Sequence, residues 1–181
     1  MKFAIIAVIL AASMIMPRKS AEAATKKPLI IYFSWGGNTR SVAERVRSLT
    51  GGDVYEIVTA NAYPKDYNAA TNLARVEQRE KLRPALKMPK IPNLSEYDTV
   101  IIASPNWWGA LPMAVMSMLD ANDFSGKKIS QIVTHGGGGA QRCESDLRSA
   151  EPKAAFTKSF ITSGGSTSGL EAWLAECGLK R

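Results

Sequence analysis

Apolar runs alternate with helix-spaced apolar positions along most of the chain. Runs rich in β-branched and aromatic residues predict five strands, at 29–33, 54–58, 97–103, 129–134 and 156–162. Apolar positions at helical spacing predict helices at 42–49, 112–119, 141–150 and 169–177. This alternation indicates an α/β fold with a parallel sheet wound by right-handed crossovers.

A polar stretch at 61–93 interrupts the alternation. Asp66 is a candidate N-cap for a charged helix that runs to about residue 83, where prolines end it. We therefore expect an inserted helical segment within a single domain that spans 24–181.

Residues 1–23 have the pattern of a cleavable secretory signal peptide. Lys2 precedes the uncharged run 3–16, and Ala21-Glu22-Ala23 provides a cleavage site. A membrane span needs about 20 apolar residues, so this run is too short to be one. We expect export by a Sec-type signal to the periplasm or the outside, with no stable membrane anchor after cleavage.

The amino-acid composition excludes several classes of protein. The chain has 181 residues, 45% of them hydrophobic, which excludes a disordered protein, and its two Cys are too few for a disulfide framework. The net charge of +7 comes without an arginine-rich run, so we expect no nucleic-acid partner. The charge fits an acidic partner protein or an anionic surface. No catalytic residue or metal ligand is predicted.

The loop after the first strand, 34–39, has the composition of an anion cradle. Gly36 and Gly37 allow close backbone approach, and Ser34, Asn38 and Thr39 provide side-chain donors at the start of a helix. The loop lacks both the Walker lysine and the dinucleotide G-x-G-x-x-G spacing, so a terminal phosphate monoester fits best. The alternative is an ordinary strand–helix turn with a Ser/Thr cap.

Two further loops follow the third and fourth strands. In 104–112, the adjacent Trp107 and Trp108 cannot both enter one core, so a planar aromatic ligand could stack there. In 134–139, His135 precedes four glycines that would let a flat ligand lie against the backbone. The alternative for 104–112 is that one Trp packs in the core and the other closes the loop by chance. The alternatives for 134–139 are a flexible surface loop and a structural role for His135. Carboxyl ends of parallel strands share one sheet edge, so the three loops should meet.

The three loops together resemble those of flavodoxin-like proteins. Loop 34–39 resembles the flavodoxin phosphate loop, although Gly36 stands where a hydroxyl residue is usual. The two flavin-flanking loops resemble segments 105–112 and 134–137. Segment 62–67 and its charged helix resemble the extra element of bacterial NAD(P)H-dependent oxidoreductases of this fold. The resemblance covers about 28–178. It implies a three-layer α/β/α sandwich, a five-stranded sheet of order 2-1-3-4-5 and one non-covalent FMN.

The resemblance also implies which residues bind FMN. Those that would hold the phosphate are Ser34, Gly36, Gly37, Asn38 and Thr39. Those that would flank the flavin ring are Pro105, Asn106, Trp107, Trp108, Gly109, Ala110, His135, Gly136, Gly137 and Gly138.

The charges near the ring loops suggest the type of redox chemistry. Segments 104–112 and 134–142 contain no Asp or Glu, so a reduced, anionic flavin would be less destabilised than beside acidic residues. We expect a two-electron oxidoreductase that passes electrons to a quinone-like or protein acceptor, with NAD(P)H as one candidate donor. The alternatives are a one-electron flavodoxin-type carrier and a module that binds FMN or another phosphate monoester without turnover.

The two cysteines test the expected winding. Cys143 starts the helix after the fourth strand and Cys177 ends the last helix, which places them on opposite faces of the sheet. Bridged Cα atoms must lie within about 7 Å, so we expect no disulfide between them.

Overall fold

A parallel sheet forms the centre of the computed structural model, which describes residues 27–179. The predicted signal peptide lies outside the described residues. The sheet order is β2-β1-β3-β4-β5, with β6 also pairing with β4, which confirms the predicted order 2-1-3-4-5. The strands are β1 (Leu29–Tyr32), β2 (Asp53–Glu56), β3 (Thr99–Pro105), β4 (Lys128–His135), β5 (Ala155–Phe156) and β6 (Phe160–Ser163).

The last predicted strand, 156–162, is split into two short strands at one edge of the sheet. β5 pairs with the start of β4 and β6 with its end. Between them, the Lys158 carbonyl accepts a hydrogen bond from the Trp173 indole N–H (2.8 Å), and Thr157 Oγ1 lies 2.8 Å from Ser130 Oγ. The carbonyl of Lys158 is thus turned toward the last helix, and the edge strand is interrupted there.

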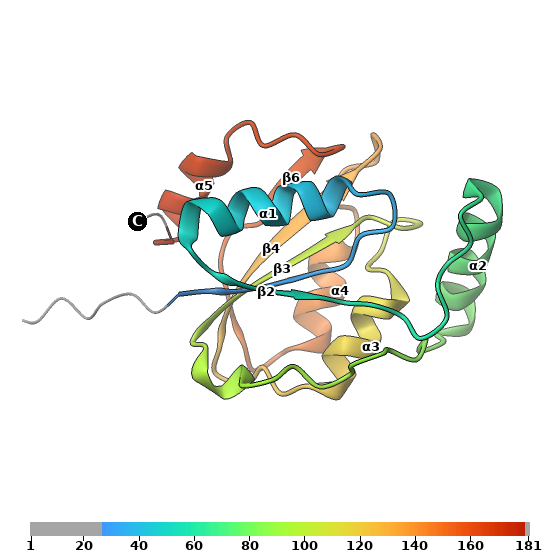
Figure 1. Cartoon of the computed structure of the whole chain (residues 1–181), viewed down its shortest axis with the longest axis horizontal. Helices are drawn as coiled ribbons and strands as arrows, with labels where there is room; N and C mark the ends of the chain where they lie inside the picture. Colours follow the sequence, from blue (N-terminus) through green and yellow to red (C-terminus); the bar gives the residue numbers. More distant parts are fainter. Residues whose placement is uncertain (1–26, 180–181) are drawn as a thin grey trace, which may run out of the picture.

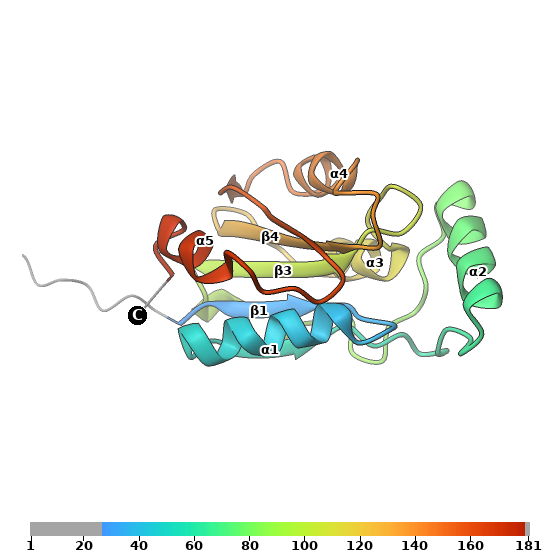
Figure 2. The ribbon, with the colours of Figure 1, turned by 90° about the horizontal axis from the view of Figure 1, so that it is seen from above.

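Helices cover both faces of the sheet, which confirms the three-layer sandwich (Figures 1 and 2). The helices are α1 (Asn38–Thr50), α2 (Tyr67–Glu80), α3 (Met113–Ala121), α4 (Cys143–Ala150) and α5 (Leu170–Glu176), with a 3-10 turn at Leu94–Glu96. α1 and α5 lie on one face, and α3 and α4 on the other. α2 stands beyond the end of the sheet where the strands point (Figure 1).

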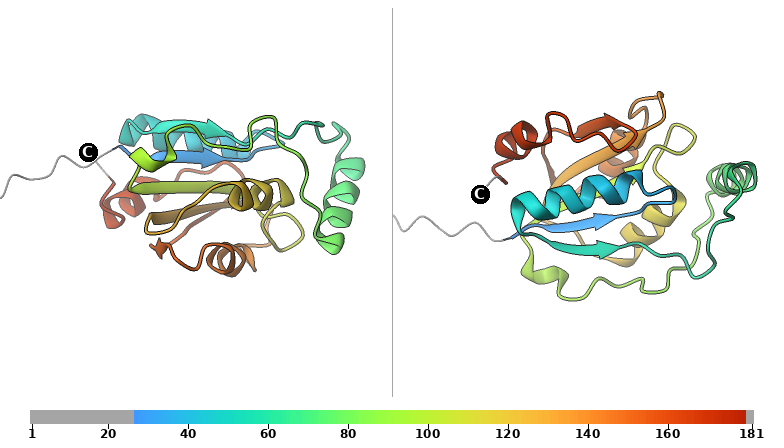
Figure 3. Two further views of the ribbon diagram at one scale, coloured as in Figure 1. Left: turned by 90° about the horizontal axis from the view of Figure 1, so that it is seen from below. Right: turned by 45° about the horizontal axis from the view of Figure 1, so that its top comes forward.

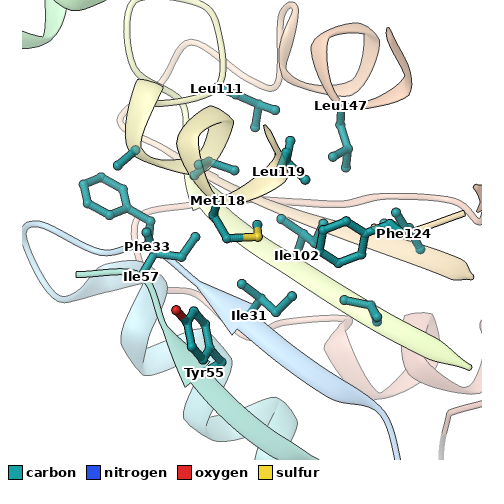
Figure 4. Packing of buried hydrophobic residues seen from close by; sticks show 14 of the residues in the cluster. Ile31, Phe33, Tyr55, Ile57, Ile102, Leu111, Met118, Leu119, Phe124 and Leu147 are labelled. Atoms are coloured by element: carbon teal, nitrogen blue, oxygen red, sulfur yellow. The ribbon is translucent and has the colours of Figure 1, made fainter. Parts of the chain in front are cut away.

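Two apolar clusters hold the layers together. Successive residues of a strand point to opposite faces, so Ile31 and Ile102 pack under α3 and α4 (Figure 4), while Ile30 and Ile101 pack under α1 and α5. This explains the continuous apolar runs, because both faces are covered. Each fully buried Ile or Leu contributes about 1.5–3 kcal/mol.

The two cysteines lie in different clusters, as expected. Cys143 packs with the α3/α4 cluster and Cys177 with the α1/α5 cluster, and both are buried free thiols. The sheet therefore separates the two sulfurs.

The inserted segment leaves and returns along the edge strand β2 (Figure 3). Asp66 caps α2 as predicted, with its Oδ1 accepting from the Ala69 N–H at 2.8 Å. α2 ends at Glu80, a little before the predicted end, because Lys81 adopts a left-handed conformation (φ 53°). The returning chain bonds the backbone after β2, from the Lys87 N–H to the Val58 carbonyl (2.9 Å). This pairing covers part of an otherwise open sheet edge.

Candidate functional site

The three predicted loops meet at the carboxyl end of the sheet around a cavity of about 400 Å³. The predicted site residues that line it are Ser34, Gly36, Asn38, Thr39, Pro105, Asn106, Trp107, Trp108, His135 and Gly136. The others belong to the same loops without lining the cavity: Gly37, Gly109, Ala110, Gly137 and Gly138. The convergence expected from strand direction is confirmed.

The first loop presents a helix N-terminus to the cavity. Gly37 is the N-cap of α1 (φ 90°), and no side chain caps the helix; Ser34 Oγ accepts from the Gly37 N–H itself (3.2 Å). The first intrahelical bond to the Gly37 carbonyl comes from Ser41 N–H (2.9 Å), so the first-turn N–H groups before it have no intrahelical acceptor. These groups and the helix dipole favour an anion.

Two buried hydroxyls join this helix to the neighbouring strand. Thr39 Oγ1 at the start of α1 lies 2.8 Å from Thr134 Oγ1 near the end of β4, and both residues line the cavity. One hydroxyl donates to the other, so the pair keeps one free O–H donor, which can bond an oxyanion.

The second loop closes in a tight turn. Trp107 and Ala110 exchange backbone hydrogen bonds of 3.0 and 3.1 Å across Trp108 (φ 53°) and Gly109 (φ 79°). Two successive positive φ values are the signature of a type I′ turn, which glycine favours. A Cβ on Gly109 would also lie 2.3 Å from Gln141 Oε1, so the flexible Gln141 side chain would have to move, and the positive φ would strain any side chain here.

Asn106 connects the second loop to the third. Its Oδ1 accepts from the Gly109 N–H (2.8 Å), and its Nδ2 donates to the Gly139 carbonyl (2.6 Å). Its backbone N–H donates to the Thr134 carbonyl (2.8 Å). Asn106 therefore fixes the relative position of the two loops as well as lining the cavity.

The two adjacent tryptophans diverge, so they do not both enter the core. Trp107 packs edge-on against Phe33 and Tyr63, with centroids 5.2 and 5.0 Å away, at the border of the α3/α4 core. Trp108 is 53% exposed, and its indole N–H donates to the Thr71 carbonyl of α2 (2.8 Å). Both line the cavity.

Helix α2 forms a wall that the sequence analysis did not assign to the site. Tyr67, Ala70, Thr71 and Ala74 line the cavity, and the two alanines are buried. Trp35 of the first loop also lines it, with its indole N–H donating to a backbone carbonyl just before α2 (2.9 Å). The spacing of Ala70 and Ala74 gives one small-residue face of the helix, but only their three-dimensional packing shows what that face borders.

His135 is half-buried and lines the cavity. Its Nδ1 accepts the Gly137 N–H (3.0 Å), so the neutral ring carries its proton on Nε2. This bond closes the start of the turn that follows β4.

A buried carboxyl lies behind the aromatic side of the site. Tyr63 donates its hydroxyl to Glu77 Oε2 of α2 (2.6 Å), and Glu77 is 6% exposed. Burial raises the pKa of Glu77, although the bond from Tyr63 acts against this, and burial also raises the pKa of Tyr63. Among the residues that the structure describes, those lining the cavity include no Asp or Glu.

A family model described as flavodoxin matches residues 27–177. The chain belongs to this flavodoxin family. Solved structures agree with the assignment. A candidate flavoprotein from Bacteroides eggerthii is 29% identical, with a TM-score of 0.75, over 85% of this chain and 99% of that one. A second candidate flavoprotein, from Bacteroides uniformis, is 30% identical, with a TM-score of 0.74, over 82% of this chain and 97% of that one.

A flavoprotein from Lactobacillus acidophilus, solved in complex with FMN, shares the flavodoxin fold. It is 21% identical, with a TM-score of 0.65, over 82% of this chain and 98% of that one. No curated protein matches the chain. Within residues 27–179, none of the helices has both the length and the apolar character that crossing a bilayer requires. In the same part of the chain, no three His, Cys, Asp or Glu side chains are grouped as metal ligands would be.

Proposed function

We propose that this flavodoxin-family chain binds FMN non-covalently in the cavity and acts as a two-electron oxidoreductase on a quinone-like or protein acceptor. The observation that supports it most directly is the joining of three loops in one cavity, with an uncapped helix N-terminus and three tryptophans in its lining. The Lactobacillus acidophilus flavoprotein of the same fold was solved with FMN.

The residues present fit this cofactor. The first-turn N–H groups of α1 and the one free O–H of the Thr39–Thr134 pair provide donors for a phosphate. Open space surrounds Gly36 and Gly136, since a Cβ built on either would meet nothing within 4 Å. The cavity volume of about 400 Å³ also falls in the range of small-molecule sites.

The protein would bind, orient and shield, while bound FMN supplies the electron-transfer chemistry. Trp108 and Trp35 offer aromatic surface for a planar ring, and His135 offers a proton on Nε2. Helix α2 reduces the access of water from the side opposite the sheet loops.

The charges around the cavity favour two-electron chemistry over a one-electron relay. No carboxylate lines the cavity within the described residues, and burial raises the pKa of the nearby Glu77. The guanidinium of Arg75 lies 5.4 Å from the centre of the Trp108 ring. A negatively charged reduced cofactor would therefore meet less repulsion here than beside acidic side chains.

Titration of the purified chain 24–181 with FMN tests the proposal. Quenching of FMN fluorescence is expected, and a Thr39→Val variant should bind about tenfold more weakly because it loses one hydroxyl donor to a charged group. Ser48→Ala, an exposed hydroxyl change in the same helix, is the matched control. Absence of FMN binding by the wild type would refute both redox functions.

A second step separates the redox alternatives. Bleaching of bound FMN by NAD(P)H, followed by reoxidation with a soluble quinone, is expected of the oxidoreductase. A carrier would instead show no reaction with NAD(P)H and two well-separated one-electron steps in a reductive titration. FMN binding without either behaviour would leave a binding module.

We also propose export through the signal pattern of residues 1–23, which the structure does not describe. Reduced nicotinamide is not expected outside the cytoplasm, so an exported oxidoreductase would take electrons from a protein donor. Fractionation of expressing cells with N-terminal sequencing tests this: a mature chain that begins at Ala24 outside the cytoplasm supports it, and an intact N-terminus in the cytoplasm contradicts it.

A further inference from the structure

The positive charge of this protein is concentrated beside the cavity. The inserted segment 61–93 carries seven Lys or Arg and three Asp or Glu. The rest of the described chain carries ten Lys or Arg and twelve Asp or Glu. One of the three acidic residues in the segment, Glu77, is buried, and burial raises its pKa. The insertion is therefore a basic element on an otherwise slightly acidic body.

Helix α2 presents exposed side chains of the types that dominate protein interfaces. We define the α2 surface as Tyr67, Leu73, Arg75, Val76 and Arg79 together with the neighbouring Trp108, all of them exposed. Tyr, Trp and Arg are the residues most enriched at binding hot spots. In Figures 1 and 3 α2 stands at the end of the molecule with no other element beyond it.

This surface is held in a fixed position relative to the cavity. The Trp108 indole bonds the Thr71 carbonyl, and Arg75 lies over the same ring. Gln78 Nε2 donates to the carbonyls of Trp107 and Leu111 in the second loop. Side chains that are already ordered lose little entropy on binding.

We propose that the α2 surface is the docking site for an acidic protein. Arg guanidinium groups pair with carboxylates through planar, two-point hydrogen bonds, and the basic insertion would attract a negatively charged partner from a distance. Trp108 and Tyr67 belong both to this surface and to the cavity wall, so the docked protein sits at the cavity entrance. That the partner is a redox protein rests on the proposed function; the docking itself does not require FMN.

A protein is a better match for this surface than a lipid membrane. Its aliphatic side chains, Leu73 and Val76, are only 39% and 38% exposed. The Trp108 indole N–H is already bonded within the protein, and the acidic Glu80 lies among the basic residues, bonded to Arg79. Membrane-surface helices have a wider apolar face than this.

Binding to an acidic haem protein, cytochrome b5, tests the proposal in the FMN-free protein. The wild type should bind it, with an affinity that falls steeply as salt rises, because contacts between exposed charges are screened. The double variant Arg75→Glu/Arg79→Glu should bind roughly tenfold or more weakly. The control is Arg45→Glu/Arg47→Glu in α1, which makes the same change in net charge on a helix covering the sheet.

The outcomes separate docking from general attraction. A loss confined to the α2 variant supports the proposal. Equal losses in both variants, no binding by the wild type, or equal binding of basic cytochrome c would overturn it. Preferential binding of phosphatidylglycerol vesicles that is lost in the α2 variant would also overturn it, in favour of a membrane surface. Because FMN is absent, none of these outcomes depends on the proposed redox function.

Discussion

The candidate phosphate loop departs from the usual flavodoxin pattern at Gly36, where a hydroxyl residue is usual. It lies on the cavity wall, its φ is not in the left-handed region, and a Cβ there meets nothing within 4 Å. Gly36→Ser should therefore tighten FMN binding about tenfold, since it adds a hydrogen-bond donor to a charged group without a clash. Fluorescence titration measures the change.

Gly36→Ala is the matched control for this substitution. It restricts the unfolded chain as serine does, and should raise stability by about 0.4–1 kcal/mol, but it brings no hydroxyl. If alanine tightens FMN binding as much as serine, the gain comes from a stiffer loop and the predicted phosphate contact is wrong.

Glu151 should make stability depend on pH. It lies at the C-terminal end of α4, and burial together with Asp123 and Asp120 raises the pKa of its carboxyl to about 7. In the unfolded chain this group titrates near 4.5. Protonation of Glu151 therefore stabilises the folded state. Its contribution to the free energy of unfolding is complete below about pH 4.5 and is lost as the pH rises to about 7.

The expected result is that Glu151→Gln raises Tm at pH 8 and has little effect at pH 4.5. Glu176→Gln, an exposed carboxyl paired with Lys158, is the control and should show no such increase. Thermal unfolding followed by circular dichroism measures both. An equal effect of Glu151→Gln at the two pH values would show that the carboxyl is not perturbed.

At the scale of elements, α2 should depend on a few contacts with the site loops. Gln78 Nε2 reaches two carbonyls of the second loop, so Gln78→Ala removes two of the side-chain bonds that hold the C-terminal half of α2 and leaves the bond from Tyr63 to Glu77. At about 1 kcal/mol per hydrogen bond, amides of α2 should exchange roughly tenfold faster, with little change in Tm because the sheet core is untouched.

Hydrogen exchange measured by mass spectrometry on the peptide that contains α2 checks this. Asn72→Ala is the control, because its side chain makes a single long contact within the same helix, with Arg75 (3.4 Å). FMN affinity should fall in Gln78→Ala but not in Asn72→Ala, since Ala70 and Ala74 move with the helix. Unchanged exchange in Gln78→Ala would mean that other contacts hold the wall.

The same elements show how far the sequence alone can predict this molecule. The alternation of strands and helices, the covering of both sheet faces and the meeting of three loops were predictable from the residues, because apolar runs and turn residues act locally and parallel strands share one edge. The cap at Asp66 was predictable for the same reason. The strand order was predicted only through the resemblance to flavodoxin-like proteins. The wall formed by α2 was not, because it depends on bonds such as Trp108 to Thr71, 37 residues apart. The break between β5 and β6 likewise depends on Trp173 reaching the Lys158 carbonyl.

At the scale of the whole molecule, the layered fold decides the fate of the two thiols. The sheet lies between Cys143 and Cys177, and burial, the largest effect, raises the pKa of Cys143 to about 12. Only a thiolate reacts readily, so the folded protein should be inert to thiol reagents. A reductant should accordingly leave its Tm unchanged.

The unfolded chain has no such protection, and this gives the last prediction. With 33 residues between them, the two cysteines can meet by ordinary loop closure before the sheet separates them. Refolding with oxidised glutathione should therefore trap part of the wild type in an internally cross-linked, non-native form. Cys177→Ser cannot form this cross-link, and a larger fraction of it should refold. Serine suits this site because Sγ already lies 3.6 Å from Thr157 Oγ1.

The readouts are non-reducing electrophoresis and the recovered FMN-binding fraction. A drop in the Tm of the native wild type on adding reductant would reveal a native disulfide, and with it a winding in which the two helices share a face.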